Sequence, residues 1–170
     1  MWVHLPPAGR LKPRLRRHEA RLGGLNGVMR FRAAYTELYV HLVWGTWDRL
    51  PLLVPGLREQ VYACIAAECR SCGADVLALG GVEDHVHLLV RLPTTISIAD
   101  LVQCVKGASS HLSTHQLAPG SFFKWQGGYA AFTVSKSVVP RVRNYIAHQA
   151  EHHHTGSLHR EAELPELAQP

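Results

Sequence analysis

The spacing of hydrophobic and polar positions changes several times along the chain, and each change predicts a new element. Residues 35–47 alternate and are rich in Val, Tyr, Thr and Trp, a pattern typical of a β-strand. Residues 57–69 instead place Val61, Ile65 and Cys69 on one stripe at helical spacing. The first part of the chain therefore predicts a strand followed by an amphipathic helix.

Two apolar, β-branched runs follow, at residues 74–81 and 83–90. They predict a β-hairpin with its turn within residues 80–84. Because successive strand side chains point to opposite faces, His85 and His87 share one face of the second strand. Two imidazoles on a rigid strand can supply half of the coordination sphere of a divalent metal. Taken alone, however, such a pair is more often two unrelated histidines at the end of a sheet.

The rest of the pattern completes a small α+β fold. Ser97 can cap a helix over residues 98–115. Residues 122–135, with aromatics and a glycine pair, predict one or two short strands. A final helix has Pro140 in its first turn and runs to about residue 153. The order β-α-β-β-α-β-α is typical of a ferredoxin-like fold, an antiparallel sheet with helices on one face.

With 170 residues, 46% of them hydrophobic, the chain can form one domain with a proper core. We assign this domain to residues 33–154. Residues 1–32 are a basic leader with eight Lys or Arg side chains and one Glu, and residues 155–170 are a loose acidic tail. The leader is expected to be disordered. It is either a nucleic-acid-binding arm or, as we favour, translated upstream sequence before an internal start at Met29.

The sequence indicates neither export nor a membrane anchor. The leader lacks the apolar stretch of a secretory signal, and no apolar run is long enough to cross a bilayer. We therefore expect a cytoplasmic protein. Its cysteines are expected to be free thiols there, because Cys69-x-x-Cys72 lacks the second pair that a zinc site needs.

The predicted last helix carries a tyrosine of potential interest. Tyr145 and Gln149 are four residues apart, which makes them neighbours on one helical face. Alone, this pattern is more typical of an ordinary amphipathic helix, with its Tyr at the edge of the core and a solvated polar face. The tyrosine gains meaning only in combination with the histidine strand.

In combination, these segments resemble a known family, the single-tyrosine HUH transposases of the insertion-sequence-200-like group, where HUH stands for His-hydrophobic-His. The resemblance extends from about Tyr39 to His153. Trp47 stands where the family commonly has Lys, whereas Arg49 is retained. The matching motifs, in chain order, are His41-Leu42-Val43-Trp44, Asp84-His85-Val86-His87-Leu88-Leu89-Val90, Leu101-Val102-Gln103, Lys106-Gly107-Ala108-Ser109-Ser110, Trp125-Gln126, Gly128-Tyr129, Ala131-Phe132-Thr133-Val134-Ser135, Tyr145-Ile146, Gln149 and Glu151-His152.

The resemblance implies a transposase that moves a small insertion sequence by cleaving and rejoining single-stranded DNA. Tyr145, on the C-terminal helix, would be the nucleophile and would form a 5′-phosphotyrosine link. The metal ligands would be His85, His87 and Gln149, and the cofactor would be Mg²⁺ or Mn²⁺. The expected DNA partner is a single strand whose element ends contain hairpins.

Contacts with DNA are harder to predict from the sequence. Residues 33–154 carry nine basic and nine acidic side chains, so no general basic surface is expected. Local contacts from a few cations, with one tryptophan as a stacking platform, are compatible with binding of a single strand or hairpin. The candidates are Arg49, Lys106, Lys124, Lys136, and either Trp47 or Trp125.

A homodimer is also expected, because residues 35–47 form a long, weakly charged strand that would pair across a two-fold axis if it lay at a sheet edge. The resemblance adds active sites shared in trans, with Tyr145 of one subunit beside the histidines of the other. Residues 127–140 offer a hinge for such an exchange, and the alternative is a monomer with its tyrosine in cis. Two other functions stay open. One is a domesticated or replication-type HUH endonuclease, and the other is a non-catalytic ferredoxin-like module that binds nucleic acid.

Overall fold

A computed structural model of the chain describes residues 35–149 apart from residue 118. The predicted basic leader, with its internal start at Met29, and the predicted acidic tail both lie outside the described residues. So does the predicted end of the last helix, residues 150–153. The domain boundaries at residues 32 and 154 therefore stay predictions.

The described residues form a four-stranded antiparallel sheet in the order β2-β3-β1-β4, together with three α-helices. The chain order is β-α-β-β-α-β-α, which confirms the predicted α+β fold. The elements are β1 (Tyr39–Gly45), α1 (Leu57–Ser71), β2 (Asp75–Val82), β3 (His85–Arg91), α2 (Ile98–Leu112), β4 (Ala130–Val134) and α3 (Val139–Ala147). A 3-10 turn at Trp47–Arg49 follows β1, and a π-helical turn at Ser113–Leu117 follows α2.

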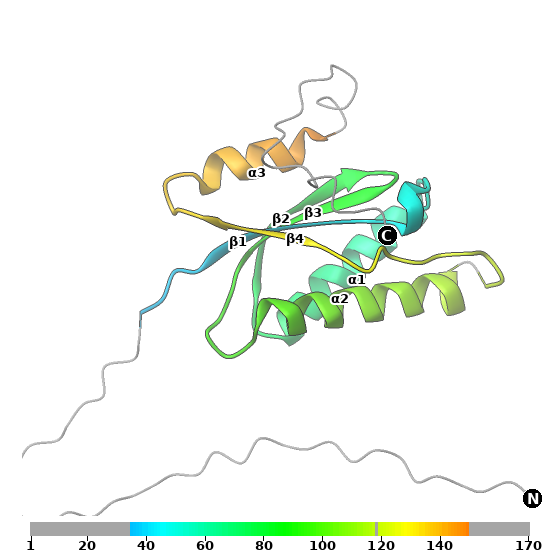
Figure 1. Ribbon diagram of the computed structural model, residues 1–170, viewed down its shortest axis with the longest axis horizontal. Coiled ribbons are helices and arrows are strands. Elements are labelled where there is room, and N and C mark those ends of the chain that lie inside the picture. Colours follow the sequence, from blue (N-terminus) through cyan, green and yellow to red (C-terminus); the bar gives the residue numbers. More distant parts are fainter. Residues whose placement is uncertain (1–34, 118, 150–170) are drawn as a thin grey trace, which may run out of the picture. The chain divides into compact units, whose positions relative to one another are not determined.

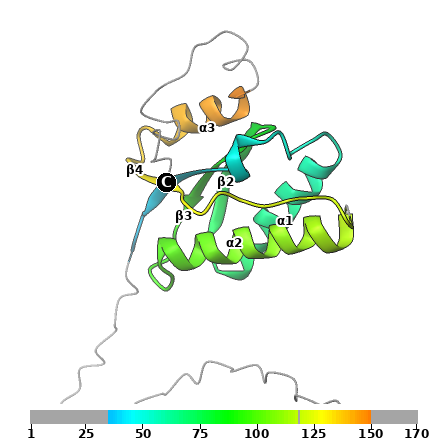
Figure 2. The ribbon, with the colours of Figure 1, turned by 45° about the vertical axis from the view of Figure 1, so that its right-hand side comes forward.

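The helices cover both faces of the sheet. Helices α1 and α2 lie together on one face, and α3 lies on the other (Figure 1). The turned view in Figure 2 keeps the same separation. The prediction of helices on one face is therefore correct for α1 and α2 and wrong for α3. An amphipathic pattern shows that a helix packs on a sheet, but it does not show on which face.

The main core lies between the sheet and the α1–α2 layer. In α1, Val61, Ile65 and Cys69 are fully buried, which confirms the predicted stripe. Helix α2 begins as predicted, because Ser97 Oγ accepts a hydrogen bond from the Asp100 amide at 3.1 Å. The central strands contribute their alternate residues to this core: Val40, Leu42, Trp44, Val86, Leu88 and Val90.

Strand β1 lies inside the sheet and not at its edge. Val43, for example, pairs with His87 of β3 on one side and with Ala130 of β4 on the other. The expected edge position of the first strand is therefore wrong, and the edges are β2 and β4. A strand with few charges is what burial on both faces also requires, so this composition does not distinguish a central strand from an exposed edge.

Two smaller expectations concern the cysteines and the membrane. The four cysteines are free thiols, and burial raises the pKa of Cys69 to about 12, so this thiol stays protonated at neutral pH. Within the part of the chain that the structure describes, no helix combines the length and apolarity needed to cross a membrane.

Candidate active site

His85 and His87 lie on the sheet face opposite to the main core. Their neighbours Val86 and Leu88 belong to the core beneath α1 and α2, so the two-residue period turns both imidazoles toward the α3 side. Both residues are fully buried, and their ring centroids are 4.9 Å apart. The Nε2 atoms of both rings are buried as well. Each Nδ1 atom contacts a different neighbouring side chain.

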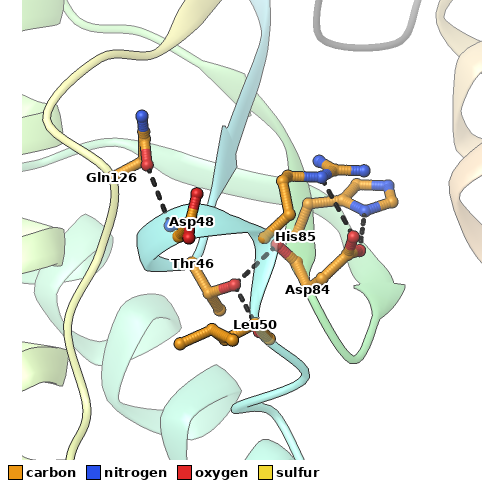
Figure 3. A network of polar contacts seen from close by, with 7 residues as sticks. Thr46, Asp48, Leu50, Asp84, His85 and Gln126 are labelled. Carbon is orange, nitrogen blue, oxygen red and sulfur yellow. Dashed lines mark hydrogen bonds and ion pairs between the residues drawn. The ribbon is translucent and has the colours of Figure 1, made fainter. Parts of the chain in front are cut away.

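Asp84 contacts His85 from the preceding position. Asp84 Oδ1 lies 2.7 Å from His85 Nδ1 (Figure 3), and the second carboxylate oxygen, Oδ2, lies 2.9 Å from Arg49 Nε. A carboxylate behind a ligand histidine fixes the tautomer and ring orientation and leaves Nε2 for a metal. Arg49 thus holds His85 in place through Asp84.

Arg49 reaches Asp84 from an unusual turn at the end of β1. Asp48 and Arg49 have φ values of 52° and 55°, in the left-handed region that residues with side chains rarely adopt. The Thr46 amide donates to the Asp84 carbonyl at 2.8 Å and holds the turn against β3. Gln126 Oε1 also holds the turn, because it accepts from the Asp48 amide at 3.2 Å (Figure 3). The chain therefore stores backbone strain directly beside the histidine pair.

A third histidine, His41 of β1, lies on the same face, and sequence reasoning did not assign it a role. His41 Nε2 is 3.0 Å from His87 Nδ1, and the two rings are stacked with centroids 5.2 Å apart. The residue is 3% exposed and packs against Phe132 of β4. Alternation places His41 on one face of its strand, but only the pairing of β1 with β3 reveals that His87 shares this face.

Helix α3 brings Tyr145 to the histidines. The Tyr145 ring packs edge-to-face on His87 of the same chain, with centroids 5.8 Å apart, and the residue is 7% exposed. Tyr145 and Ile146 form a second, smaller core with Leu89. The helix begins as predicted, with Pro140 in its first turn. The structure thus brings the predicted tyrosine and the predicted histidine pair together.

Gly80 of β2 permits this close packing of α3. It pairs with His87 across the hairpin, and a Cβ atom at this position would lie only 2.6 Å from the carbonyl oxygen of Ile146. A larger residue here would displace α3 from the sheet, and Tyr145 with it. The requirement for glycine comes from this close approach of two backbones.

Gln149, the third predicted ligand, is a buried residue. Helix α3 ends at Ala147, with His148 as its C-cap, and Gln149 comes directly after this cap. Gln149 is 1% exposed, and neither of its amide atoms has a hydrogen-bond partner among the described residues. A buried amide needs a partner for its polar atoms, and a cation could satisfy its oxygen atom.

These donors fit a divalent metal of the predicted kind. Two neutral imidazoles and an amide oxygen suit Mn²⁺, and with several waters they also suit Mg²⁺. Among the described residues, no three or more His, Cys, Asp or Glu side chains are grouped as metal ligands. Within residues 35–149 apart from 118, Gln149 is thus the further protein ligand that we consider for a metal bound by His85 and His87, and water could supply other positions.

Two of the candidates for DNA contact have structural roles. Trp125 is 5% exposed, and its Nε1 donates to Ser109 Oγ at 3.0 Å, so the ring offers no open face to a base. The Lys106 ammonium lies within 2.6 to 3.3 Å of the carbonyl oxygens of Gln126, Gly127 and Gly128. Burial lowers the pKa of Lys106 to about 8, which leaves the ammonium the main form at neutral pH. Its three donors are used by these carbonyls.

The other candidates are exposed. The Arg49 side chain is 47% exposed beside Asp84, and the Lys136 side chain is 67% exposed, with Nζ 2.6 Å from Glu37 Oε1. Lys124 Nζ lies 3.5 Å from the ring centroid of Trp47, a residue that is 41% exposed. Of the two tryptophans considered for stacking, Trp47 is therefore the accessible one.

Comparison with known proteins identifies the family. The profile of the IS200-like transposases, the Y1_Tnp family, matches residues 34–149. The chain therefore belongs to the IS200-like transposase family, as the resemblance in its sequence implied.

Individual relatives agree with this assignment. The chain is 27% identical over 120 residues to the ISDra2 transposase TnpA of Deinococcus radiodurans, and the match covers 66% of this chain and 84% of that protein. It is also 26% identical over 116 residues to the transposase for insertion sequence element IS200 of Salmonella typhimurium. This match covers 65% of this chain and 76% of that protein.

Solved structures agree on the fold. A crystal structure of a candidate transposase from Deinococcus radiodurans R1 has a TM-score of 0.55 and 27% identity, and covers 69% of this chain and 95% of that one. A REP-associated tyrosine transposase, solved bound to a REP hairpin, also has a TM-score of 0.55, with 15% identity and coverage of 72% and 73%. At this identity the second structure supports the fold alone.

Proposed function

We propose that this transposase cleaves and rejoins single-stranded DNA through a covalent bond to Tyr145, and that it moves a small insertion sequence in this way. The observation that carries the proposal is the contact of the Tyr145 ring with His87, at 5.8 Å between centroids, beside the buried His85. Membership of the IS200-like family supports it.

The proposed step is a transesterification. Tyr145 Oη attacks a backbone phosphorus, and the new Oη–P bond forms as the bond from phosphorus to the 3′-oxygen breaks. The phenol loses its proton, and the departing 3′-oxygen gains one. One strand end then stays joined to the protein through its 5′-phosphate, and the other ends in a free 3′-hydroxyl. Because a phenol has a pKa of about 10, phenolate is a competent leaving group and a 3′-hydroxyl can reverse the step.

The proposed cofactor is Mg²⁺ or Mn²⁺, held by Nε2 of His85, Nε2 of His87 and the amide oxygen of Gln149. Such an ion, when bound, would stabilise the charge that develops on the phosphate oxygens. The chain itself supplies orientation. Asp84 holds the ring of His85, and the packing of α3 on Gly80 sets the distance of Tyr145 from the sheet.

The proposed substrate is a single strand with hairpins at the element ends. Among the sequence candidates, the exposed Arg49, Lys136 and the Lys124–Trp47 pair are the residues we assign to DNA contact. A tryptophan face accepts any base by stacking, and a lysine beside it can contact the phosphate.

The proposal is tested with oligonucleotides labelled at one end and taken from DNA beside the gene. On a denaturing gel, a 3′-labelled strand should become attached to the protein, whereas a 5′-labelled strand should be released. Omission of the metal, or His85→Ala or His87→Ala at limiting Mn²⁺, should remove the product. If no adduct forms with any DNA while binding persists, the protein is a nucleic-acid-binding module instead.

The subunit arrangement is decided by mixing two inactive variants, Tyr145→Phe and the double variant His85→Ala/His87→Ala. Tyr145 contacts His87 of its own chain, which supports an active site within one chain. In that case the mixture stays inactive after subunit exchange. The homodimer with shared sites that the sequence suggested would regain one intact site, and the mixture would form adduct.

A further inference from the structure

The buried face behind the proposed metal site contains one histidine that the proposed function does not use. His41 lies between two rings, His87 on β3 and Phe132 on β4, and is 3% exposed. Burial of a polar ring at this depth is costly unless the ring has a defined hydrogen-bonding role. Three histidines on one face also invite the interpretation of a three-histidine metal site.

The geometry argues against His41 as a third ligand. Its Nε2 atom lies 3.0 Å from Nδ1 of His87, which is hydrogen-bonding distance between two ring nitrogens. While this contact exists, that nitrogen is directed at another side chain and not at an ion. The nitrogen of His87 that can bind a metal is Nε2, on the other side of the ring.

The hydrogen bond has only one direction that permits metal binding. A neutral imidazole has one N–H donor and one acceptor nitrogen. For His87 to offer the lone pair of Nε2, its proton must be on Nδ1, so Nδ1 donates and His41 Nε2 accepts. In the opposite direction, the His87 proton would be on Nε2 and the ring would have no lone pair for the ion.

We propose that His41 is a positioning residue, which accepts a hydrogen bond from His87 Nδ1 and thereby fixes both the tautomer and the ring orientation of His87 for metal binding through Nε2. This inference rests on the proposed function. It gives the two proposed ligands different supports, because His85 is held by the charged Asp84 and His87 by a neutral ring. Outer residues of this kind typically change metal affinity roughly 10- to 100-fold.

The test measures Mn²⁺ binding to the full chain by calorimetry, without DNA. His41→Phe removes the acceptor while it keeps a ring against Phe132, and it should weaken Mn²⁺ binding roughly 10- to 100-fold. His41→Gln can accept through its amide oxygen and should recover most of the affinity. Phe132→Leu is the matched control, because it alters the packing around His41 without touching the hydrogen bond, and its affinity should equal that of the wild type.

A second readout separates positioning from a purely structural role. Nitrogen NMR of histidine-labelled, metal-free protein reports which ring nitrogen of His87 carries the proton. We expect Nδ1–H in the wild type and a loss of this preference in His41→Phe. Unchanged Mn²⁺ affinity in a folded His41→Phe would overturn the inference, and so would an Nε2–H tautomer of His87 in the wild type. If the wild type bound no Mn²⁺, the metal part of the proposed function would fall, while the proton position on His87 would still decide this inference.

Discussion

The two faces of the sheet are made by the same strands, but they differ in the size of their apolar cores and in the polar side chains that they bury. On β3, Val86 and Leu88 belong to a large apolar core that α1 and α2 cover. On the other face, the side chains of His41, Asp84 and Tyr145 contact His85 and His87. The smaller apolar core on that face contains Leu89, Tyr145 and Ile146. The period of two therefore assigns the larger apolar core to one face and the proposed site to the other.

The difference also concerns how each face is covered. Helices α1 and α2 have 15 residues each, whereas α3 has 9. A helix as short as α3 is marginal in isolation and depends on tertiary packing. Loss of a contact on the α3 side should therefore displace the tyrosine before it unfolds the protein, and this separation can be tested by mutation.

The largest effect is expected for Tyr145→Phe. This change removes the proposed nucleophilic oxygen and keeps the ring that packs on His87, so the covalent DNA adduct should be lost completely while the melting temperature stays close to that of the wild type. Gel analysis of adducts and thermal melting measure the two quantities. Persistence of the adduct would identify another nucleophile, with Tyr129 and Tyr39 as the next candidates.

A pair of adjacent leucines compares the two faces directly. Leu88 and Leu89 are both fully buried, the first in the main core and the second under α3. Leu88→Ala should lower the free energy of unfolding by about 4 kcal/mol and Leu89→Ala by about 2 kcal/mol, the upper and lower parts of the usual range. Denaturant unfolding measures this order.

Activity should follow the opposite order for the same two variants. At a temperature where both are folded, Leu89→Ala should lose more adduct formation than Leu88→Ala, because it loosens the support of Tyr145. Equal losses of activity in the two variants would contradict the division between the faces.

A smaller and more local effect is expected at Gly80. Gly80→Ala places a Cβ atom against the carbonyl oxygen of Ile146 and should shift α3 outward, which should reduce adduct formation roughly tenfold because misplaced reacting groups are costly. Gly127→Ala is the matched control, because a Cβ atom there meets nothing within 4 Å. Single-turnover rates of the two variants provide the comparison. Equal rates would show that α3 tolerates the displacement.

The smallest effect is expected at the exposed end of the Asp84 contact. Arg49→Gln removes an ion pair whose arginine side chain is 47% exposed, so stability should change by less than about 1 kcal/mol. Asp84→Asn, which alters the partner of His85 itself, should weaken Mn²⁺ binding roughly tenfold. Calorimetric titration ranks the two variants. If Arg49→Gln weakened Mn²⁺ binding more than Asp84→Asn did, the proposal that Asp84 is the more important support of His85 would be wrong.

Much of this arrangement could be predicted from the sequence, because it follows from local periodicity. Alternation in residues 83–90 places His85 and His87 together, and the Ser97 cap and Pro140 mark where two helices begin. Each of these signals depends only on residues that are close together in the sequence. The family resemblance suggested the proposed role of Tyr145, which periodicity alone could not.

What the sequence could not supply depends on pairing between distant segments. His41 meets His87 only because β1 lies between β3 and β4, and the same central position removes the predicted sheet edge. The structural roles of Lys106 and Trp125 depend on contacts with residues 126–128 and with Ser109, respectively. Composition describes how polar a segment is, but it does not identify its neighbours.

The connection between β4 and α3 limits how far α3, and with it Tyr145, can lie from the end of β4. Strand β4, which is paired with β1, ends at Val134, and α3 begins at Val139. Of the predicted hinge at residues 127–140, only residues 135–138 therefore connect the strand to the helix. Within this link, the Val138 amide donates to the Ser135 carbonyl at 2.9 Å. Fully extended, this link spans at most roughly 14 Å. An exchange of α3 between two copies of the chain would thus be possible only if the symmetry axis passed close to the end of β4. The length of residues 135–138 thus sets a geometric limit for any shared arrangement in which β4 stays paired with β1 of its own chain.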